Sequence, residues 1–228
     1  YTNAISNNAD LIFCNFNYIN NGKLEKSKFN RNMSFKGNNN LYIKKLLKNN
    51  IKICIGSIMI KRRLIEDNKI RFVEGYKNYE DQDFIVKVLF HSKKIKALPE
   101  KLLYYTLRKD SASQQFLNKV NYVPIYNMLG QYLTNKEANK EIVDYIYKYK
   151  IPTTYLSIIS SIIKNKYPRQ HIIDLCNDQN IKSQITKFEF MEYDFNEIIT
   201  WFKIQLYLMY PYIYDKILSR KWRCFFDE

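Results

Sequence analysis

The chain has 228 residues, a formal net charge of +15 and four cysteines. This length suits one sizeable domain or a domain with a helical appendage. No signal-peptide pattern and no clean apolar stretch of about 20 residues is visible, so we expect a soluble or membrane-surface protein. The widely spaced cysteines form no CxxC pair, which favours reduced thiols over a zinc or redox site. The charge predicts an acidic partner: nucleic acid, anionic lipid or a phosphorylated substrate.

The first part of the chain alternates between strand-like and helix-like segments. Residues 10–16 predict a short buried strand, and the Asn- and Lys-rich segment 20–40 predicts a long loop or loose hairpin. Helical spacing of apolar residues follows over 41–47. Residues 51–60 predict a strand interrupted by a tight turn, and 64–68 predict a single helical turn.

A cluster of three acidic residues follows in this otherwise basic chain. Glu80, Asp81 and Asp83 begin an amphipathic helix, because the following apolar residues step at intervals of three and four. Two strand-like runs around Pro99 follow and end in polar and aromatic residues. In α/β proteins, active sites commonly lie at the edge of the sheet where strands end. Carboxylates at the start of a helix, next to a strand that ends in polar and aromatic residues, are expected at such an edge. The helix dipole also favours acidic residues there, so capping is an alternative.

The second part of the chain reads as helical. Few Gly or Pro and many apolar positions at helical spacing predict four to six helices after Ser113, with breaks near Pro152, Pro168 and Lys182. The stretch 201–214 is aromatic and apolar, and basic residues follow it. This combination suits an anionic membrane interface. Packing of the helix against the preceding domain explains the apolar residues equally well.

The order of motifs in the first half resembles the second half of the catalytic domain of family 2 glycosyltransferases, which have the GT-A fold. No single motif is specific, and the resemblance depends on their order and spacing over residues 5–115. The matching segments are Ile55–Arg62, Arg71-Phe72-Val73-Glu74-Gly75, Glu80-Asp81-Gln82-Asp83-Phe84, Leu103–Arg108 and Ser111-Ala112-Ser113.

This resemblance implies a fold class and a division into domains. Residues 1–113 are expected to form the acceptor-side half of a GT-A domain, an α/β fold with a Rossmann-like mixed sheet. Residues 114–228 are expected to form a mainly α-helical C-terminal region. The donor-binding half of the enzyme would then be missing from this chain, so we expect the fragment alone to be inactive.

The resemblance also implies roles for individual carboxylates. In the family, the Asp of the Glu-Asp pair is the general base, which corresponds to Asp81 here. Glu80 beside it would hydrogen-bond the acceptor or raise the pKa of Asp81 through like-charge proximity. The residues expected to bind the acceptor are Asp83, Glu74, Ser57 and Tyr105.

Donor and metal binding are expected to involve other residues. Arg108 and Lys109 could contact the donor diphosphate, since a guanidinium binds phosphate through two hydrogen bonds. Family members often have Arg one residue after the Tyr, where this chain has Thr106, and a surface ion pair is the alternative role for Arg108. Asp81-Gln82-Asp83 spells D-x-D, but the family's metal motif lies upstream of Tyr1. We therefore expect Mg²⁺ or Mn²⁺ in the full-length enzyme, with ligands outside this chain.

Together these expectations describe an inverting glycosyltransferase. It would use a nucleotide sugar, expected to be a UDP-sugar, and a saccharide or lipid-linked acceptor in cell-surface polysaccharide, lipopolysaccharide or capsule synthesis. It would be cytoplasmic or peripheral at the inner face of the cytoplasmic membrane. One alternative is a nucleic-acid-binding module, but basic residues are spread along the chain without a recognised motif. The other alternative is a non-catalytic helical scaffold on a membrane surface.

Overall fold

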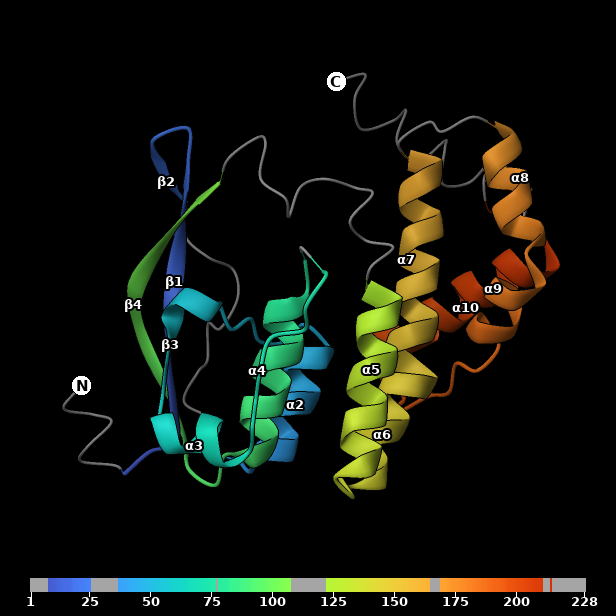
Figure 1. Ribbon diagram of the computed structural model, residues 1–228. Helices are drawn as coiled ribbons and strands as arrows, with labels where there is room; N and C mark the ends of the chain where they lie inside the picture. Colours follow the sequence, from blue (N-terminus) through green and yellow to red (C-terminus); the bar gives the residue numbers. More distant parts are fainter. Residues whose placement is uncertain are drawn as a thin grey trace. The chain divides into compact units, whose positions relative to one another are not determined.

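The computed structural model describes residues 8–25, 37–76, 78–107, 122–164, 169–210 and 214 (Figure 1). It divides into two compact units, residues 1–121 and residues 122–228. The first unit combines a sheet with helices, and the elements described in the second unit are helices. This confirms the expected fold class, an α/β domain followed by a mainly helical region. The expected division after residue 113, and the roles given to the two parts, stay predictions.

Strand β1 (Leu11–Asn20) is the central strand of a mixed sheet. Strand β4 (Ile95–Leu107) runs parallel to it along its whole length. The antiparallel strands β2 (Lys23–Glu25) and β3 (Ile58–Ile60) pair with opposite ends of β1. Because β4 occupies one full edge of β1, β2 and β3 share the other edge. The expected strand at 10–16 is confirmed and extends further.

The hairpin between β1 and β2 turns at an Asn-Gly pair. Asn21 and Gly22 both have left-handed φ angles, 48° and 76°. Two positive φ angles at an Asn-Gly pair are typical of the tight turns that match the twist of antiparallel strands. The predicted loose hairpin is therefore confirmed at its first turn, and residues 26–36 of that segment lie outside the described residues.

Strand β4 continues past Pro99, where the sequence predicts two separate runs. The register with β1 moves from Cys14 opposite Leu98 to Asn15 opposite Lys101, so Pro99 and Glu100 are left out of the ladder. Proline has no backbone N–H to donate, and a strand tolerates it at such an irregularity. The irregularity keeps β4 a single strand.

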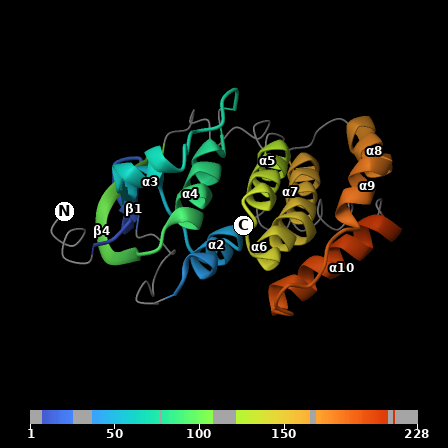
Figure 2. The same cartoon turned by 60° about the horizontal axis from the view of Figure 1, so that its bottom comes forward.

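Helices α2 (Asn39–Leu47) and α4 (Glu80–His91) pack side by side in this unit (Figures 1 and 2). The Tyr42 ring of α2 meets the Phe13 ring of β1 edge to face, with 5.9 Å between the centroids. The amide Nδ2 of Asn39 donates to the carbonyl of Phe90 at 2.7 Å, which joins the start of α2 to the end of α4. The two helices are thus antiparallel, and the end of α2 lies toward the start of α4.

The expected strand over 51–60 is wrong for its first part. Only β3, at residues 58–60, is a strand, and a 3₁₀ turn (Ile55–Ser57) precedes it. Ile51 and Ile53 are buried without a ladder partner, so their apolar character reflects packing into the core. Helix α3 (Arg62–Asp67) then confirms the predicted helical turn.

The second unit begins with α5 (Tyr122–Asn135) and a long helix with three parts: α6 (Lys140–Asp144), a π-helical segment (Tyr145–Lys150) and α7 (Ile151–Lys164). Helices α8 (Arg169–Asn177), α9 (Gln179–Ile185) and α10 (Phe195–Met209) follow. One buried cluster joins residues of α7, α9 and α10 with Tyr214: Leu156, Ile159, Ile163, Ile185, Ile204, Tyr207 and Tyr214.

Two of the predicted helix breaks are wrong. The helix continues through Pro152, because the π-helical segment precedes it and the backbone N–H of Glu189 donates to the carbonyl of Lys148 at 2.9 Å. Lys182 lies inside α9, and the break falls instead at Asp178, whose side chain caps that helix. The predicted break near Pro168 lies outside the described residues.

Candidate active site at the start of helix α4

The first turn of α4 holds three carboxylates, those of Glu80, Asp81 and Asp83. Since α4 leads into β4, its last turn lies at the end of the sheet where β4 begins. The first turn therefore points toward the carboxyl ends of the parallel strands β1 and β4 (Figure 1). This is the edge at which α/β sheets commonly bind ligands. The helix dipole also favours negative charge at this position.

The backbone entering α4 is strained. Tyr79, the residue before the helix, has a left-handed φ of 71°, and Gly75 in the preceding turn has a φ of 84°. A left-handed tyrosine costs about 1–3 kcal/mol, and such residues occur often at functional sites. The Phe72 ring stacks on the Phe84 ring of α4 at 4.2 Å, which ties the approaching segment to the helix. This stack packs the segment before Tyr79 against the helix after it.

Asp81 has the environment of a carboxylate base. Its side chain is half-buried, and Oδ1 accepts the backbone N–H of Gln82 at 2.7 Å. Burial raises the pKa of Asp81 above its ordinary value, whereas the Gln82 hydrogen bond and the positive charge of Lys52 oppose this rise. A carboxylate with a raised pKa accepts a proton more readily than an exposed one.

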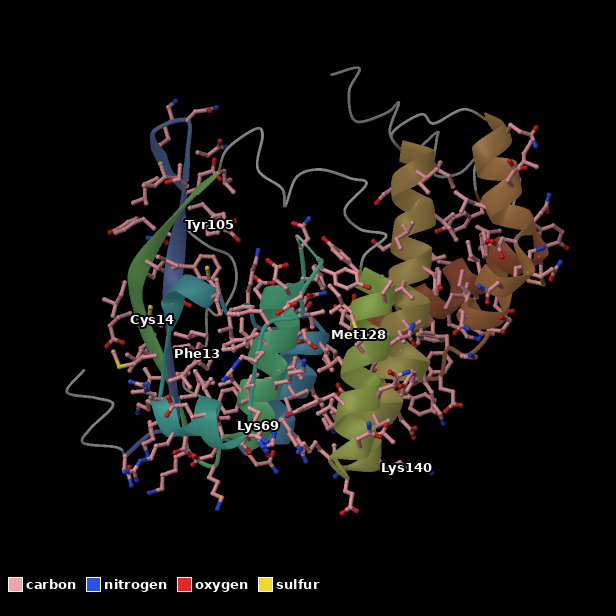
Figure 3. The ribbon with its side chains drawn as sticks, viewed as in Figure 1. Phe13, Cys14, Lys69, Tyr105, Met128 and Lys140 are labelled. Carbon is pink, nitrogen blue, oxygen red and sulfur yellow. The ribbon has the colours of Figure 1, made fainter. Side chains whose placement is uncertain are left out.

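Lys52 is a residue of the site that the sequence did not single out. Its ammonium group donates to the hydroxyl of Tyr18 at 3.1 Å and lies 5.6 Å from the centroid of that ring. Tyr18 and Tyr105 are direct partners across β1 and β4, and their rings meet edge to face at 6.0 Å. Figure 3 shows Tyr105 toward the carboxyl-terminal end of β4, away from Phe13. Tyr105, which is expected in the site, is thus linked to Lys52 through Tyr18.

Several buried polar atoms at the start of α4 and on β1 have no hydrogen-bond partner among the described residues. Asp83 is 1% exposed, and its Oδ2 accepts from the ammonium of Lys87 at 2.6 Å, but its Oδ1 has no hydrogen-bond partner in the described part of the chain. Within the same described ranges, the Oε2 of Glu80, the Nδ2 of Asn78 and the Oδ1 of Asn17 on β1 are likewise buried and unpaired. Such atoms are uncommon in folded proteins and often indicate a site for a polar ligand.

The remaining expected residues lie in different surroundings. Glu74 is exposed in the turn before α4. Ser57 is buried, and its hydroxyl donates to the carbonyl of Cys54 at 2.8 Å within the 3₁₀ turn. Arg108 and Lys109, the expected phosphate contacts, lie outside the described residues. The functional roles of all the expected site residues stay predictions.

The described residues do not include a set of metal ligands. In the described ranges, no group of three or more His, Cys, Asp or Glu side chains is placed to hold a metal ion. Asp83 of the D-x-D sequence is instead paired with Lys87. The expectation that Mg²⁺ or Mn²⁺ binds through residues outside this chain stays a prediction.

The comparisons with known proteins support the fold. No family model and no curated protein matches the sequence. The structure is similar to the crystal structure of S. aureus TarS, residues 1–349, in complex with UDP-GlcNAc, with a TM-score of 0.57 and 16% sequence identity. The similarity covers 95% of this chain, but the chain spans only 59% of the TarS chain. TarS is a glycosyltransferase, so the chain has a glycosyltransferase-like fold. Membership of family 2 and the GT-A fold stay predictions.

Proposed function

We propose that this chain is part of an inverting glycosyltransferase that uses a nucleotide sugar, with Asp81 as the general base. The observation that carries the proposal is the half-buried Asp81 carboxylate with a raised pKa, located at the carboxyl end of parallel strands. The similarity to TarS, which was crystallised with UDP-GlcNAc, supports a nucleotide-sugar donor and makes a UDP-sugar the first choice. Synthesis of cell-surface polysaccharide, lipopolysaccharide or capsule is the pathway we propose.

The proposed chemistry is a single displacement. The oxygen of an acceptor hydroxyl forms a bond to the anomeric carbon of the donor, and the bond from that carbon to the diphosphate oxygen breaks. The nucleoside diphosphate leaves with the electron pair, and the hydroxyl proton passes to the carboxylate of Asp81. A positioned general base contributes about 10² to 10⁴ in rate. Mg²⁺ or Mn²⁺, when bound by the full-length enzyme, would stabilise charge on the diphosphate.

The neighbouring groups would orient the acceptor. Glu80 has a buried oxygen that no described residue hydrogen-bonds, and Asn17 and Asn78 each have a buried amide atom for which the same holds. Acceptor hydroxyls can donate to the Glu80 and Asn17 oxygens and accept from the Asn78 amide. Tyr105, with part of its ring exposed, would contact a sugar ring. Because these atoms have no partner among the residues that the structure describes, they are available to the hydroxyl groups of a saccharide.

The test is sugar transfer by the full-length parent protein. Wild type and Asp81→Asn are assayed with a panel of nucleotide sugars and Mg²⁺ or Mn²⁺, by nucleotide release and product formation. We expect Asp81→Asn to lose about 10² to 10⁴ in turnover and still bind the nucleotide. Asp67→Asn, which alters an exposed carboxylate in α3, is the matched control and should keep full activity.

Two results would contradict the proposal. Equal transfer by wild type and Asp81→Asn would show that the acidic turn is structural and caps the helix. Absence of both transfer and donor hydrolysis across the panel would mean that the fold has been retained without this chemistry. Sugar transfer by residues 1–228 alone would contradict the narrower expectation that this chain is inactive without a donor-binding half.

A peripheral location at an anionic membrane surface is a further part of the proposal. None of the helices in the described ranges combines the length and the apolar character that a membrane span requires. Helix α10 instead exposes Phe195, Ile198, Phe202 and Met209, which recur along one helical face. Exposed apolar patches of this kind mark interaction surfaces. With the net charge of +15, an anionic lipid surface is the partner we propose.

A further inference from the structure

Strands β1 and β4 pair regularly at their carboxyl ends, where the last five residues of β1 lie opposite the last five of β4 (Figure 1). Direct partners on neighbouring strands are about 4.8 Å apart and point to the same face of the sheet, and successive residues alternate between the two faces. Tyr18 and Tyr105 follow this rule, since they are direct partners and their rings are in contact at 6.0 Å. Asn17 and Tyr104, the pair just before them, therefore share the opposite face.

Asn17 is an unusual residue for the inside of a strand. Asparagine is depleted in strands, and this one is only 8% exposed. Asn15, two residues earlier on β1, is also buried, but its Oδ1 accepts the backbone N–H of Phe16 at 2.9 Å. The Oδ1 of Asn17 has no such bond to any residue that the structure describes. A buried acceptor in this state lowers stability, so its presence calls for a ligand or an ordered water.

The residues around Asn17 on this face are exposed and amphipathic. Its direct partner Tyr104 is 56% exposed, so the phenol ring is not a core side chain. Thr106, two residues further along β4, is on the same face and offers an exposed hydroxyl. Thr106 is the direct partner of Ile19, which in turn pairs with the exposed Leu24 of β2. A buried acceptor is thus surrounded by an aromatic ring, a hydroxyl and aliphatic groups.

This combination selects the class of ligand. A sugar ring has faces of C–H groups, which pack on an aromatic ring, and hydroxyls around its rim, which donate hydrogen bonds. A purely apolar ligand would leave the Asn17 oxygen without a donor, at a cost in affinity. An anion would be repelled by the same oxygen, which carries a partial negative charge. Sites with an apolar lining and few polar groups are typical of small-molecule binding.

We propose that Asn17 and Tyr104 form a saccharide-binding subsite: a sugar hydroxyl donates to the Asn17 Oδ1, and the sugar ring packs on the Tyr104 phenol. Because the Asn17 oxygen is buried before the ligand arrives, a neighbouring side chain must move aside. Tyr104 can turn without loss of core packing, since more than half of it is exposed. The subsite lies at the carboxyl ends of β1 and β4, so it extends acceptor binding along that edge of the sheet. The choice of a saccharide rests on the proposed function, whereas the site itself rests on the register and burial of the two residues.

The test measures binding to the full-length protein with the methyl glycosides of glucose, galactose and N-acetylglucosamine as probes. Ligand-observed saturation-transfer NMR gives Kd values even for single sugar rings that bind weakly. Asn17→Leu should raise Kd by about two- to tenfold, which corresponds to one lost hydrogen bond. Tyr104→Ser should raise it by at least about twofold, because the apolar area of the ring is lost, whereas Tyr104→Phe should bind as wild type does. Tyr210→Ser, which removes a tyrosine 54% exposed in the second unit, is the matched control and should leave Kd unchanged.

Urea unfolding of Asn17→Leu separates binding from a structural role. Leucine has a similar size and no acceptor, so the unfolding midpoint should stay the same or rise if Asn17 serves a ligand. A lower midpoint with unchanged glycoside binding would overturn the inference, and would show that Asn17 is hydrogen-bonded within the folded protein or to a buried water. Wild-type protein that binds none of the three glycosides would overturn it as well.

Failure of the proposed function would have a different appearance. A full-length protein that transfers no sugar from any nucleotide donor would lack the proposed activity. If that protein still bound the glycosides, and bound them less tightly as Asn17→Leu and Tyr104→Ser, the subsite would stand without the chemistry. If instead the protein transferred sugar and both variants bound the glycosides as tightly as wild type, the subsite would be refuted and the proposed function would stand.

Discussion

The phenol ring of Tyr147 lies over the Cα of Gly130, so close that a Cβ at residue 130 would come within 2.6 Å of the ring atom Cζ. Gly130 belongs to α5 and Tyr147 to the π-helical segment, so this contact sets how closely the two elements approach. Glycine in a helix interior is less favourable than alanine by about 1 kcal/mol. The close approach of the ring explains why glycine stands there.

We expect Gly130→Ala to destabilise the helical unit, although alanine is the better helix former. Overpacking costs about 1–3 kcal/mol, which over most of that range exceeds the gain in helix propensity of about 1 kcal/mol. The free energy of unfolding from urea titration measures the net effect. Gly56→Ala is the matched control, since a Cβ there would lie 3.7 Å from the nearest atom of Leu103. In the double variant Gly130→Ala/Tyr147→Leu, the shorter leucine side chain leaves room for the Cβ of the new alanine, so stability should be restored. A Gly130→Ala protein that is more stable than wild type would contradict the packing argument.

Lys150→Met should stabilise the protein at neutral pH. Lys150 is buried against the Tyr126 ring, and burial lowers the pKa of its ammonium group from 10.5 to about 8. Below pH 8 the folded protein must hold a buried charge that the unfolded chain exposes to water, which costs about 3 kcal/mol at 1.36 kcal/mol per pKa unit. This cost declines as the pH rises from about 8 and is absent above 10.5. The increase in the free energy of unfolding caused by Lys150→Met should therefore be largest at pH 7 and disappear by pH 10.5. Urea unfolding at several pH values between 7 and 10.5 measures it.

Lys148 provides the opposite case on the same helical segment. Its hydrogen bond with Glu189, at 2.9 Å, raises the pKa of its ammonium group above the ordinary value. The stabilising effect of Lys148 is therefore present below pH 10.5 and lost as the pH rises through the folded pKa. Unfolding curves across pH 6 to 11 should show Lys148→Met less stable than wild type at neutral pH. A Lys150→Met protein that behaves in the same way would contradict the assignment of a buried, destabilising charge.

The short-range patterns of the sequence predict much of the first unit. The helix period from Phe84 onward and the carboxylates before it predict α4 and its acidic first turn, because both signals come from neighbouring residues. The same holds for β1 and α2. The candidate base Asp81 could therefore be placed at a helix start without a structure. Its raised pKa could not, because burial depends on what the rest of the chain packs around it.

Long-range contacts explain where the local patterns fail. Pro152 does not end its helix, because the carbonyl of Lys148 accepts an N–H from Glu189 in a distant segment. Pro99 does not divide β4, because β1 continues the ladder beyond the irregularity. Lys52 has no local signature in a chain with 37 basic residues, and it enters the site only through the packing of α2 against α4.

Lys87→Met should cost far more stability than the loss of an exposed ion pair. Lys87 and Asp83 form an ion pair of 2.6 Å, with the Asp83 side chain fully buried. Removing the lysine leaves a buried carboxylate without its cation, which costs about 3–5 kcal/mol near neutral pH. Arg62→Met, which removes one partner of the exposed pair between Arg62 and Glu66, is the matched control and should cost less than about 1 kcal/mol.

The loss in Lys87→Met should also depend on pH. Burial already raises the pKa of Asp83 above 3.8, and removing Lys87 raises it further because Lys87 lowers it in the wild type. The folded variant then binds a proton more readily than the unfolded chain. Its stability should recover as the pH falls through the folded pKa of Asp83 toward 3.8. Urea unfolding at pH 5 and pH 8 checks this, and Lys87→Met/Asp83→Asn should lack the dependence. An equal loss at both pH values in the single variant would indicate lost packing alone.

The exposed aromatic residues of α10 should determine whether the protein binds a membrane surface. Phe195 and Phe202 are 74% and 62% exposed, and their spacing of seven residues puts them on one face of the helix. Partial burial of two phenylalanine side chains at a lipid interface accounts for at least one factor of ten in partitioning. Phe195→Ser/Phe202→Ser should therefore reduce cosedimentation with vesicles of phosphatidylcholine and phosphatidylserine by about tenfold or more.

The control for this loss is an equally exposed apolar residue in the other unit. Leu24 in β2 is 58% exposed, and Leu24→Ser should bind vesicles as wild type does. Binding should also weaken with added salt and on vesicles of phosphatidylcholine alone, because part of the attraction comes from basic side chains. Wild-type protein that stays in the supernatant with anionic vesicles would refute the membrane-surface proposal. Equal binding by wild type and the double variant would show that α10 is not the surface involved, and its exposed face would then need a protein partner to cover it.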